Sequence, residues 1–148
     1  MPAFVFSLRY EDSANWAICK SSGLIGVRSS PSAIRSAAQV RDGDTIFVWR
    51  GGGQRPGSGL LAMITATDRA RPALNAPWPD PEIYTYVVPF TLNRELRKAI
   101  PDRFPDNRRG IRFGIQNTDL QKGLRPLSPD SVAKLAACFG GAKAPNPR

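Results

Sequence analysis

Histidine is absent from the 148 residues of this sequence. Its absence removes the commonest general base and metal ligand, and it excludes every Ser–His or Cys–His nucleophile pair. Acidic residues are few, and the close pairs Asp42–Asp44 and Asp80–Glu82 lie in predicted turns, where capping or solvation explains them. We therefore expect a chain that is not an enzyme and that uses no metal or cofactor.

Cysteine and long apolar runs are also scarce. Cys19 and Cys138 lie far apart and without metal-ligand spacing, so two buried thiols in a reducing cytoplasm are expected. No stretch approaches the roughly 20 apolar residues that a membrane span needs, and the N-terminus has no basic leader before its short apolar run. These features favour a cytoplasmic protein with no membrane partner.

Basic residues, by contrast, are abundant. The sequence has 21 Lys and Arg against 12 Asp and Glu, which gives a net charge of +9. Arginine predominates, and its planar guanidinium suits phosphates and base edges. Nucleic acid is therefore the leading class of partner, although a genome biased toward arginine codons would also give a basic surface.

Hydrophobic periodicity predicts alternating short strands and helices. Ser30 and Ser128 are expected to cap helices, and Gly23 is expected to end one in the left-handed conformation. This order favours an α+β fold, a small mixed β-barrel flanked by short helices, rather than a parallel α/β sheet. The chain suits one domain over 1–141, with 142–148 as a tail or linker. Strands are predicted at 4–8, 24–28, 43–50, 60–67, 83–90 and 111–115, and helices at 13–22, 31–41, 91–100 and 129–139.

The stretch 43–67 is the centre of this predicted fold, with two apolar strands joined by a glycine-rich break. Both faces of the first strand are apolar, which predicts a central place in the sheet. Trp49 ends that strand, and we expect its ring to be only half covered. The glycine-rich break lacks the Gly-Lys-Ser/Thr ending of a P-loop. We interpret it as a mobile hairpin loop that presents Arg50 and Arg55 to nucleic acid.

Two tryptophans and two amides have the character of a base-binding site. Trp49 lies at a strand exit, and Trp78 lies in the proline-rich loop 68–81. Exposed rings near amides such as Asn15 or Asn117 are what recognition of a flipped base requires, because rings stack on the base and amides bond its edge. Coverage of the core is the alternative role for both tryptophans.

Four short segments form a pattern along the first half of the chain: NWAICK at 15–20, GLIGVRS at 23–29, GDTIFVW at 43–49 and GLLAMI at 59–64. In this order they resemble the EVE domain, a PUA-like domain related to YTH domains. The strand expected at 83–90 and the segment 113–117 match the later half of the family pattern, so the resemblance spans about residues 4–139. It implies a PUA-like barrel, flanked by helices, that binds a modified base in an aromatic-lined pocket.

The resemblance also implies roles for matching residues. It places Asn15, Ile25, Gly26, Trp49 and Trp78 at the base, with Arg28 and Ser29 directly after the base-contacting segment. The family's tryptophan is Ile25 here, which removes one aromatic wall and favours a modified pyrimidine. The complete predicted site is a base pocket of Asn15, Ile25, Gly26, Trp49, Trp78 and Asn117 and a backbone-binding set of Arg28, Ser29, Arg50 and Arg55.

We therefore expect a reader that flips and binds 5-methylcytosine or 5-hydroxymethylcytosine in double-stranded DNA. The resemblance implies that it is the recognition module of a modification-dependent restriction system. An N6-methyladenine reader and an RNA-binding PUA-like module are the alternatives. The tail 142–148 resembles a shortened linker, which would suit attachment to a nuclease domain or association with a nuclease subunit.

Overall fold

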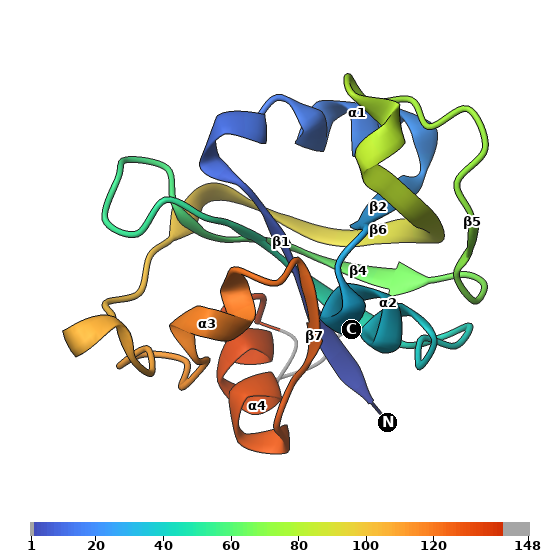
Figure 1. Cartoon of the computed structure of the whole chain (residues 1–148). Coiled ribbons are helices and arrows are strands. Elements are labelled where there is room, and N and C mark those ends of the chain that lie inside the picture. The colour runs from blue at the N-terminus through green and yellow to red at the C-terminus, as the bar shows by residue number, and fades with distance from the viewer. Residues whose placement is uncertain (1, 141–148) are drawn as a thin grey trace.

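The computed structural model describes residues 2–140 (Figure 1), so the expected tail at 142–148 lies outside the described residues. Within that range, no helix is long and apolar enough to cross a membrane. The strands are β1 (Ala3–Leu8), β2 (Leu24–Arg28), β3 (Thr45–Arg50), β4 (Gly59–Ala66), β5 (Arg71–Pro72), β6 (Tyr84–Ile100) and β7 (Leu124–Pro126). The helices are α1 (Asn15–Ser22), α2 (Pro31–Ala37), α3 (Asn117–Leu120) and α4 (Pro129–Ala137), with 3-10 turns η1 (Tyr10–Asp12), η2 (Pro81–Ile83) and η3 (Pro105–Asn107).

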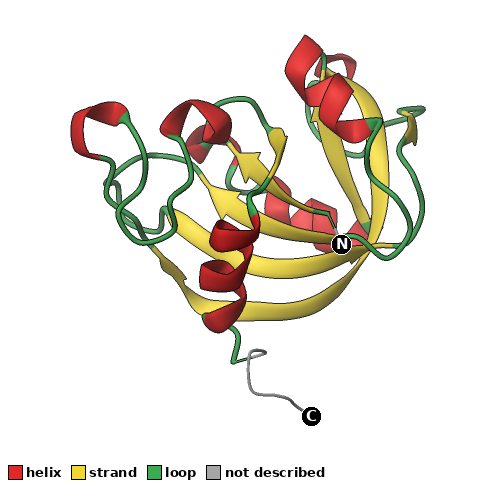
Figure 2. Cartoon of the chain, turned by 90° about the horizontal axis from the view of Figure 1, so that it is seen from below, coloured by secondary structure: helices red, strands yellow, loops and turns green. Residues whose placement is uncertain are grey.

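The strands form one mixed sheet in the order β2-β6-β4-β3-β1-β7, with β5 paired to β6. β1 and β3 run parallel, whereas the other pairs are antiparallel. Figure 2 shows that the long strands curve into a half-barrel, with short helices packed against it. The predicted α+β class and the central position of β3 are confirmed.

Alternation along the strands divides the apolar residues between two cores. Ile46 and Val48 of β3 enter one core, which also receives Trp16 of α1. Phe47 and Trp49 point the other way, into a second core that α4 closes. This division follows from the two-residue period of a strand, and it decides which side chains can reach a given pocket.

Three predicted helix ends are reproduced, namely the start of α2, the start of α4 and the end of α1, whereas α2 ends at Ala37 and not at the predicted residue 41. The Ser30 hydroxyl accepts a hydrogen bond from the Ala33 N–H at 3.3 Å, and the Ser128 hydroxyl accepts one from the Ser131 N–H at 3.2 Å. Gly23 ends α1 with φ of 70°, a conformation that glycine adopts without steric cost. These caps are local interactions, so the sequence is enough to predict them.

The helix expected at 91–100 is wrong, because β6 continues as a strand through these residues. Thr91 pairs with Thr65 of β4, and Ile100 pairs with Leu60 at the far end. Glu95 of this half accepts a hydrogen bond from the Trp16 indole N–H at 2.8 Å. Pairing with β4 therefore overrides the helical propensity of the segment.

The strand expected at 111–115 is also wrong, and a buried carboxylate gives the reason. Asp102 is 4% exposed, and its two oxygens accept hydrogen bonds from the N–H groups of Arg103, Arg112 and Phe113 at 2.7, 2.8 and 3.0 Å. Two of these N–H groups would be needed for a strand ladder. The segment 101–115 is therefore folded around Asp102 as an irregular loop.

We predict that Asp102→Ala lowers the free energy of unfolding by about 2–4 kcal/mol, because it leaves buried N–H groups without acceptors. Urea denaturation measures the change. Asp130→Ala is the matched control: its side chain is 78% exposed and pairs with Lys134 within α4, so stability should hardly change. Equal effects of the two substitutions would contradict the role given to Asp102.

Candidate functional site

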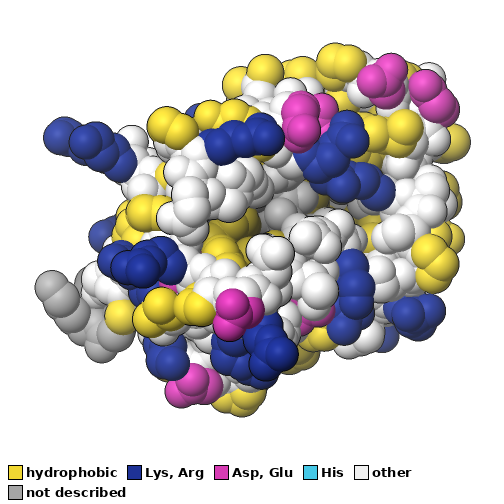
Figure 3. All heavy atoms as spheres, turned by 60° about the vertical axis from the view of Figure 1, so that its left-hand side comes forward, with side chains coloured by type: hydrophobic (Ala, Val, Ile, Leu, Met, Phe, Trp, Pro, Cys, Tyr) yellow, Lys and Arg dark blue, Asp and Glu magenta, His cyan; other side chains and the backbone are white. Residues whose placement is uncertain are grey.

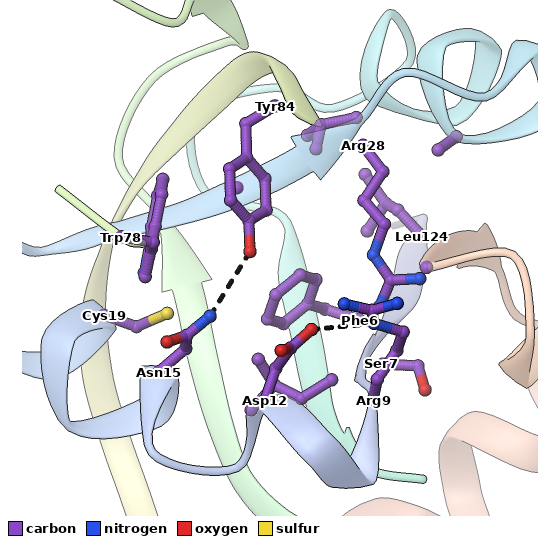
Figure 4. Close-up of a pocket in the computed structure, with 15 residues that line it drawn as sticks. Phe6, Ser7, Arg9, Asp12, Asn15, Cys19, Arg28, Trp78, Tyr84 and Leu124 are labelled. Carbon is purple, nitrogen blue, oxygen red and sulfur yellow. Dashed lines mark hydrogen bonds and ion pairs between the residues drawn. The ribbon is translucent and has the colours of Figure 1, made fainter. Parts of the chain in front are cut away.

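A pocket lies where α1, β2 and the start of β6 meet (Figure 4). Asn15 and Cys19 of α1 line one side, and Gly26 of β2 is also in the lining. Trp78, from the loop before η2, and Tyr84, the first residue of β6, place their rings across it. Three parts of the chain therefore supply the pocket: α1 gives an amide and a thiol, β2 gives a bare backbone, and residues 78–84 give two aromatic rings.

Gly26 leaves room for the two rings to approach the strand. A Cβ atom at this position would lie 2.5 and 2.8 Å from two ring carbons of Tyr84 and 3.0 Å from one of Trp78. The two ring centroids are 4.7 Å apart with an interplanar angle of 47°. Contact between rings over a bare backbone is therefore possible only because residue 26 has no side chain.

Asn15 holds the phenol of Tyr84. The residue is buried, with 7% exposure, and its Nδ2 donates a hydrogen bond of 3.3 Å to the Tyr84 hydroxyl. Burial and the nearby charge of Asp12 raise the pKa of Tyr84, although the Asn15 hydrogen bond opposes that rise. The pocket therefore already contains a six-membered ring whose oxygen is bonded by an amide.

Trp78 has an unusual environment for a buried tryptophan. Its ring is 3% exposed, yet its indole N–H has no hydrogen-bond partner among residues 2–140 that meets ordinary geometry. The thiol of Cys19 lies near the Trp78 ring. An unpaired buried N–H costs about 1–3 kcal/mol, so the ring is held at an energetic cost that a ligand could relieve.

The pocket is closed in this conformation. Its rings leave a cavity of about 10 Å³, which is about the space of one water molecule. A ligand the size of a base would enter only after Trp78 or Tyr84 had moved. Trp78 is carried by a loop in which Asn75 and Asp80 have positive φ values of 56° and 55°.

Two arginines line the side of the pocket away from Trp78 (Figure 4). Arg9 pairs with Asp12 at 2.7 Å, whereas the guanidinium of Arg28 donates no hydrogen bond to any residue in the described range. Burial lowers the pKa of Arg28, and the like charge of Arg9 lowers it further. Both side chains also line a second, larger cavity beside the pocket.

Within residues 2–140, no three His, Cys, Asp or Glu side chains are grouped in a way that would hold a metal ion. The chemistry that this site offers is therefore stacking, hydrogen bonding and positive charge.

The structure brings together Asn15, Gly26, Trp78 and Arg28 of the predicted site, but it places Trp49 elsewhere. Trp49 is 3% exposed, so the expectation that its ring would be half covered is wrong. Its ring makes edge contacts with Phe104 at 6.4 Å and Phe113 at 5.8 Å between centroids. Strand alternation sends it into the second core, on the opposite face of β3 from the residues that pack beneath the pocket.

Two other predicted pocket residues also lie outside the lining. Ile25 is fully buried in the first core, because it points to the opposite face of β2 from its neighbour Gly26. Asn117 begins α3 and its backbone N–H bonds the carbonyl of Arg108. Neither side chain is among those that line the pocket.

The four predicted backbone-binding residues divide into two pairs. Arg28 and Arg55 line the second cavity. Arg50 instead donates a hydrogen bond of 3.0 Å to the Gly57 carbonyl, and Ser29 bonds the carbonyl of Ile83 at 3.2 Å. These two residues therefore form hydrogen bonds within the protein. The Arg50 bond holds the glycine-rich loop 51–58, which was expected to be a mobile loop.

Tyr84, Cys19 and Arg9 are the residues that sequence reasoning missed. Tyr84 begins the strand that follows the Trp78 loop, so its nearness to Trp78 in the chain was a usable signal. Arg9 directly follows an apolar strand, where side chains commonly reach a site. Nothing in the sequence distinguished Cys19 from an ordinary core residue.

The fold has solved relatives, although no family model matches the sequence and no curated protein matches it. The human THYN1 protein, solved in complex with 5-methylcytosine-containing DNA, is 12% identical with a TM-score of 0.64, and the match covers 94% of this chain and 98% of that one. The Mmi1 YTH domain is 12% identical with a TM-score of 0.65, covering 96% and 97%. A complex of the YTH domain-containing protein Mmi1 with RNA gives 10% and 0.60, covering 95% and 83%.

These likenesses establish the fold. They confirm the predicted PUA-like α+β architecture, and they confirm the resemblance to EVE and YTH domains at the level of the fold.

We predict that Gly26→Ala lowers the free energy of unfolding by about 1–3 kcal/mol, because the added methyl group overlaps the Tyr84 ring. Chemical denaturation measures this change. Tyr84→Ala removes the obstacle, so the double variant should lose much less than the sum of the two single variants. Additive losses would show that the ring does not depend on the bare backbone.

Cys19 is expected to react slowly with thiol reagents, because burial raises its pKa to about 11 and the Trp78 contact lowers it only partly. Cys138 is partly exposed and should be alkylated first in a mass-spectrometric time course. The Cys19 rate should rise about tenfold per pH unit below its pKa, since the thiolate is the reactive form. Trp78→Ala should accelerate it. Equal rates at the two cysteines would contradict the closed pocket.

Proposed function

We propose that this protein, which shares its fold with THYN1 and the Mmi1 YTH domain, is a non-catalytic reader of a modified base in DNA. The base would be 5-methylcytosine or 5-hydroxymethylcytosine, flipped from the duplex into the pocket of Asn15, Gly26, Trp78 and Tyr84. Flipping costs a few kcal/mol of stacking and pairing. Contacts with the rings and the amide would have to offset that cost.

The arrangement of Tyr84 is the observation that carries the proposal. Its phenol lies against Trp78, above the bare backbone of Gly26, and its oxygen receives a hydrogen bond from Asn15. A pyrimidine ring is of similar size and also bears an oxygen at its edge. A flipped cytosine could therefore replace the phenol and inherit both contacts once Tyr84 swings aside.

The same geometry favours a cytosine derivative over N6-methyladenine. Asn15 Nδ2 bonds a ring-borne oxygen in the free protein. Cytosine has a carbonyl oxygen at C2, whereas adenine has none. Ile25, at the position of the family's tryptophan, contributes no wall because it is buried in the core. Trp78 is therefore the ring that would stack on the base once Tyr84 has swung aside.

DNA is preferred as the partner because THYN1 was solved with 5-methylcytosine-containing DNA. The RNA complex of Mmi1 supports a second candidate, an RNA-binding module with the same pocket. Competition between a methylated duplex and a single-stranded RNA separates the two functions. Salt dependence alone does not, because both partners present phosphates.

We further propose that the reader serves a modification-dependent restriction system in the cytoplasm, with cleavage supplied by a nuclease domain or subunit. The support is the resemblance to EVE domains together with the lack of histidine in the sequence. Recovery of a nuclease with the tagged full chain from its native cells, and its loss in cells lacking that nuclease, would test the association.

We predict that Trp78→Ala weakens binding to a 5-methylcytosine duplex by about 1–3 kcal/mol, or roughly 5- to 150-fold, because it removes one stacking surface. Fluorescence anisotropy with duplexes carrying one cytosine, 5-methylcytosine, 5-hydroxymethylcytosine or N6-methyladenine measures affinity and preference. Trp78→Phe keeps a ring and should lose less.

Trp49→Phe is the matched control for this experiment. Trp49 is equally buried, at 3% exposure, but lies in the second core, so modified-DNA binding should be unchanged while the protein remains folded. Tightest binding to N6-methyladenine would overturn the assignment of the base. An unchanged affinity in Trp78→Ala would overturn the assignment of the pocket.

A further inference from the structure

The second cavity adjoins the pocket but differs from it in size and in the residues that line it. It has a volume of about 320 Å³, against the 10 Å³ left free between the rings, so it is open without any movement. Ser7, Leu8, Arg9 and Arg28 line both spaces. The surface turned forward in Figure 3 is hollowed, and Lys and Arg side chains border the hollow.

Two guanidinium groups face each other where the two spaces join (Figure 4). Asp12 pairs with Arg9 at 2.7 Å, but in the described part of the chain no oxygen accepts a hydrogen bond from Arg28. Arg28 is partly buried, and the like charge of Arg9 acts on it, as do the opposite charges of Asp12 and Glu11. Because Asp12 is paired with Arg9, Arg28 has no ion-pair partner of its own in the described part of the chain.

A third arginine stands at the other side of this cavity. Arg55 lies over the ring of Tyr10, with its guanidinium carbon 4.8 Å from the ring centroid. The Tyr10 hydroxyl donates a hydrogen bond of 2.9 Å to the Pro56 carbonyl, which holds the loop that carries Arg55. Glu11 is the acidic residue in the lining. Three guanidinium groups and the Glu11 carboxylate therefore line this cavity, and the net charge stays positive when Asp12 of the adjoining pocket is counted as well.

We propose that this cavity is a phosphate-binding site centred on the Arg9–Arg28 pair, with Arg55 closing its far side. Guanidinium groups present paired N–H donors that match phosphate oxygens. A phosphate between them would supply the acceptor that Arg28 lacks and would screen its repulsion from Arg9. The cavity is large enough for a phosphate and part of a sugar, whereas its neighbour would take a flat ring only after Trp78 or Tyr84 had moved.

The position of the cavity indicates which molecule would carry the phosphate. This step rests on the proposed function. A base in the pocket and a phosphate in the cavity would share the wall formed by Ser7, Leu8, Arg9 and Arg28. The phosphate would then belong to the nucleotide whose base is bound. It is either a phosphodiester of a nucleic acid or the monoester of a free nucleotide.

The first experiment follows the arginine Nε–Hε resonances of the full chain during titration with inorganic phosphate. The resonances of Arg9 and Arg28 should shift and saturate with phosphate but not with chloride at equal ionic strength. Arg28→Gln should weaken phosphate binding on the order of tenfold, since it removes charge-assisted hydrogen bonds. Arg97→Gln, at an exposed arginine of β6 outside the cavity lining, should have no effect.

Arg28→Gln should leave the melting temperature unchanged or raise it, because the guanidinium loses solvation without gaining a partner. A clear fall in the melting temperature would instead assign Arg28 a structural role and overturn the proposal. So would equal responses of Arg28→Gln and Arg97→Gln, or shifts that chloride reproduces.

The second experiment distinguishes the sources and separates this inference from the proposed function. Affinities are compared for 5-methyl-2′-deoxycytidine, its 5′-monophosphate, its 3′-monophosphate and a short duplex containing it. Arg28→Gln should weaken every phosphate-bearing ligand and spare the nucleoside. It should weaken modified and unmodified duplexes by the same factor and reduce the salt slope by about one. If the protein bound modified and unmodified duplexes equally, but Arg28→Gln still weakened every phosphate-bearing ligand, the reader function would be refuted and the phosphate site would stand.

Discussion

Strand β6 pairs with three other strands along its 17 residues, and both the sheet and the pocket depend on that pairing. Its first half lies between β2 and β5, and its second half continues along β4. The register with β2 places Val27 opposite Tyr86 and Arg28 opposite Tyr84, with an irregularity between the two pairs. That register brings the ring of Tyr84 over the side-chain-free backbone of Gly26.

The pocket and the adjoining cavity both contain hydrogen-bond donors that the described part of the chain leaves free. The Trp78 indole N–H in the pocket is buried and without an acceptor, and such a group is costly. The Arg28 guanidinium in the cavity is partly exposed and makes no ion pair among residues 2–140. A ligand that spans both spaces could use both donors.

Several residues of the candidate site could be predicted from the sequence, but the complete set of residues that line the pocket could not. Asn15, Gly26, Trp78 and Arg28 were predicted because they match a pattern of motifs, and they do meet. Trp49 was misplaced, although the alternation of β3 was known, because alternation defines two faces without saying which one carries a pocket. Tyr84 was missed because its place in the pocket depends on the pairing of β2 with β6. No pattern of neighbouring residues predicts that pairing.

The sequence by itself determined the α+β class, the serine caps of α2 and α4, the glycine end of α1 and the central place of β3. All depend on interactions within a few residues or on the periodicity of one segment. Tertiary structure alone decided that 91–100 is a strand and that 111–115 is a loop around Asp102. In each case the backbone N–H groups found partners that are distant in sequence, and such partners outweigh local propensity.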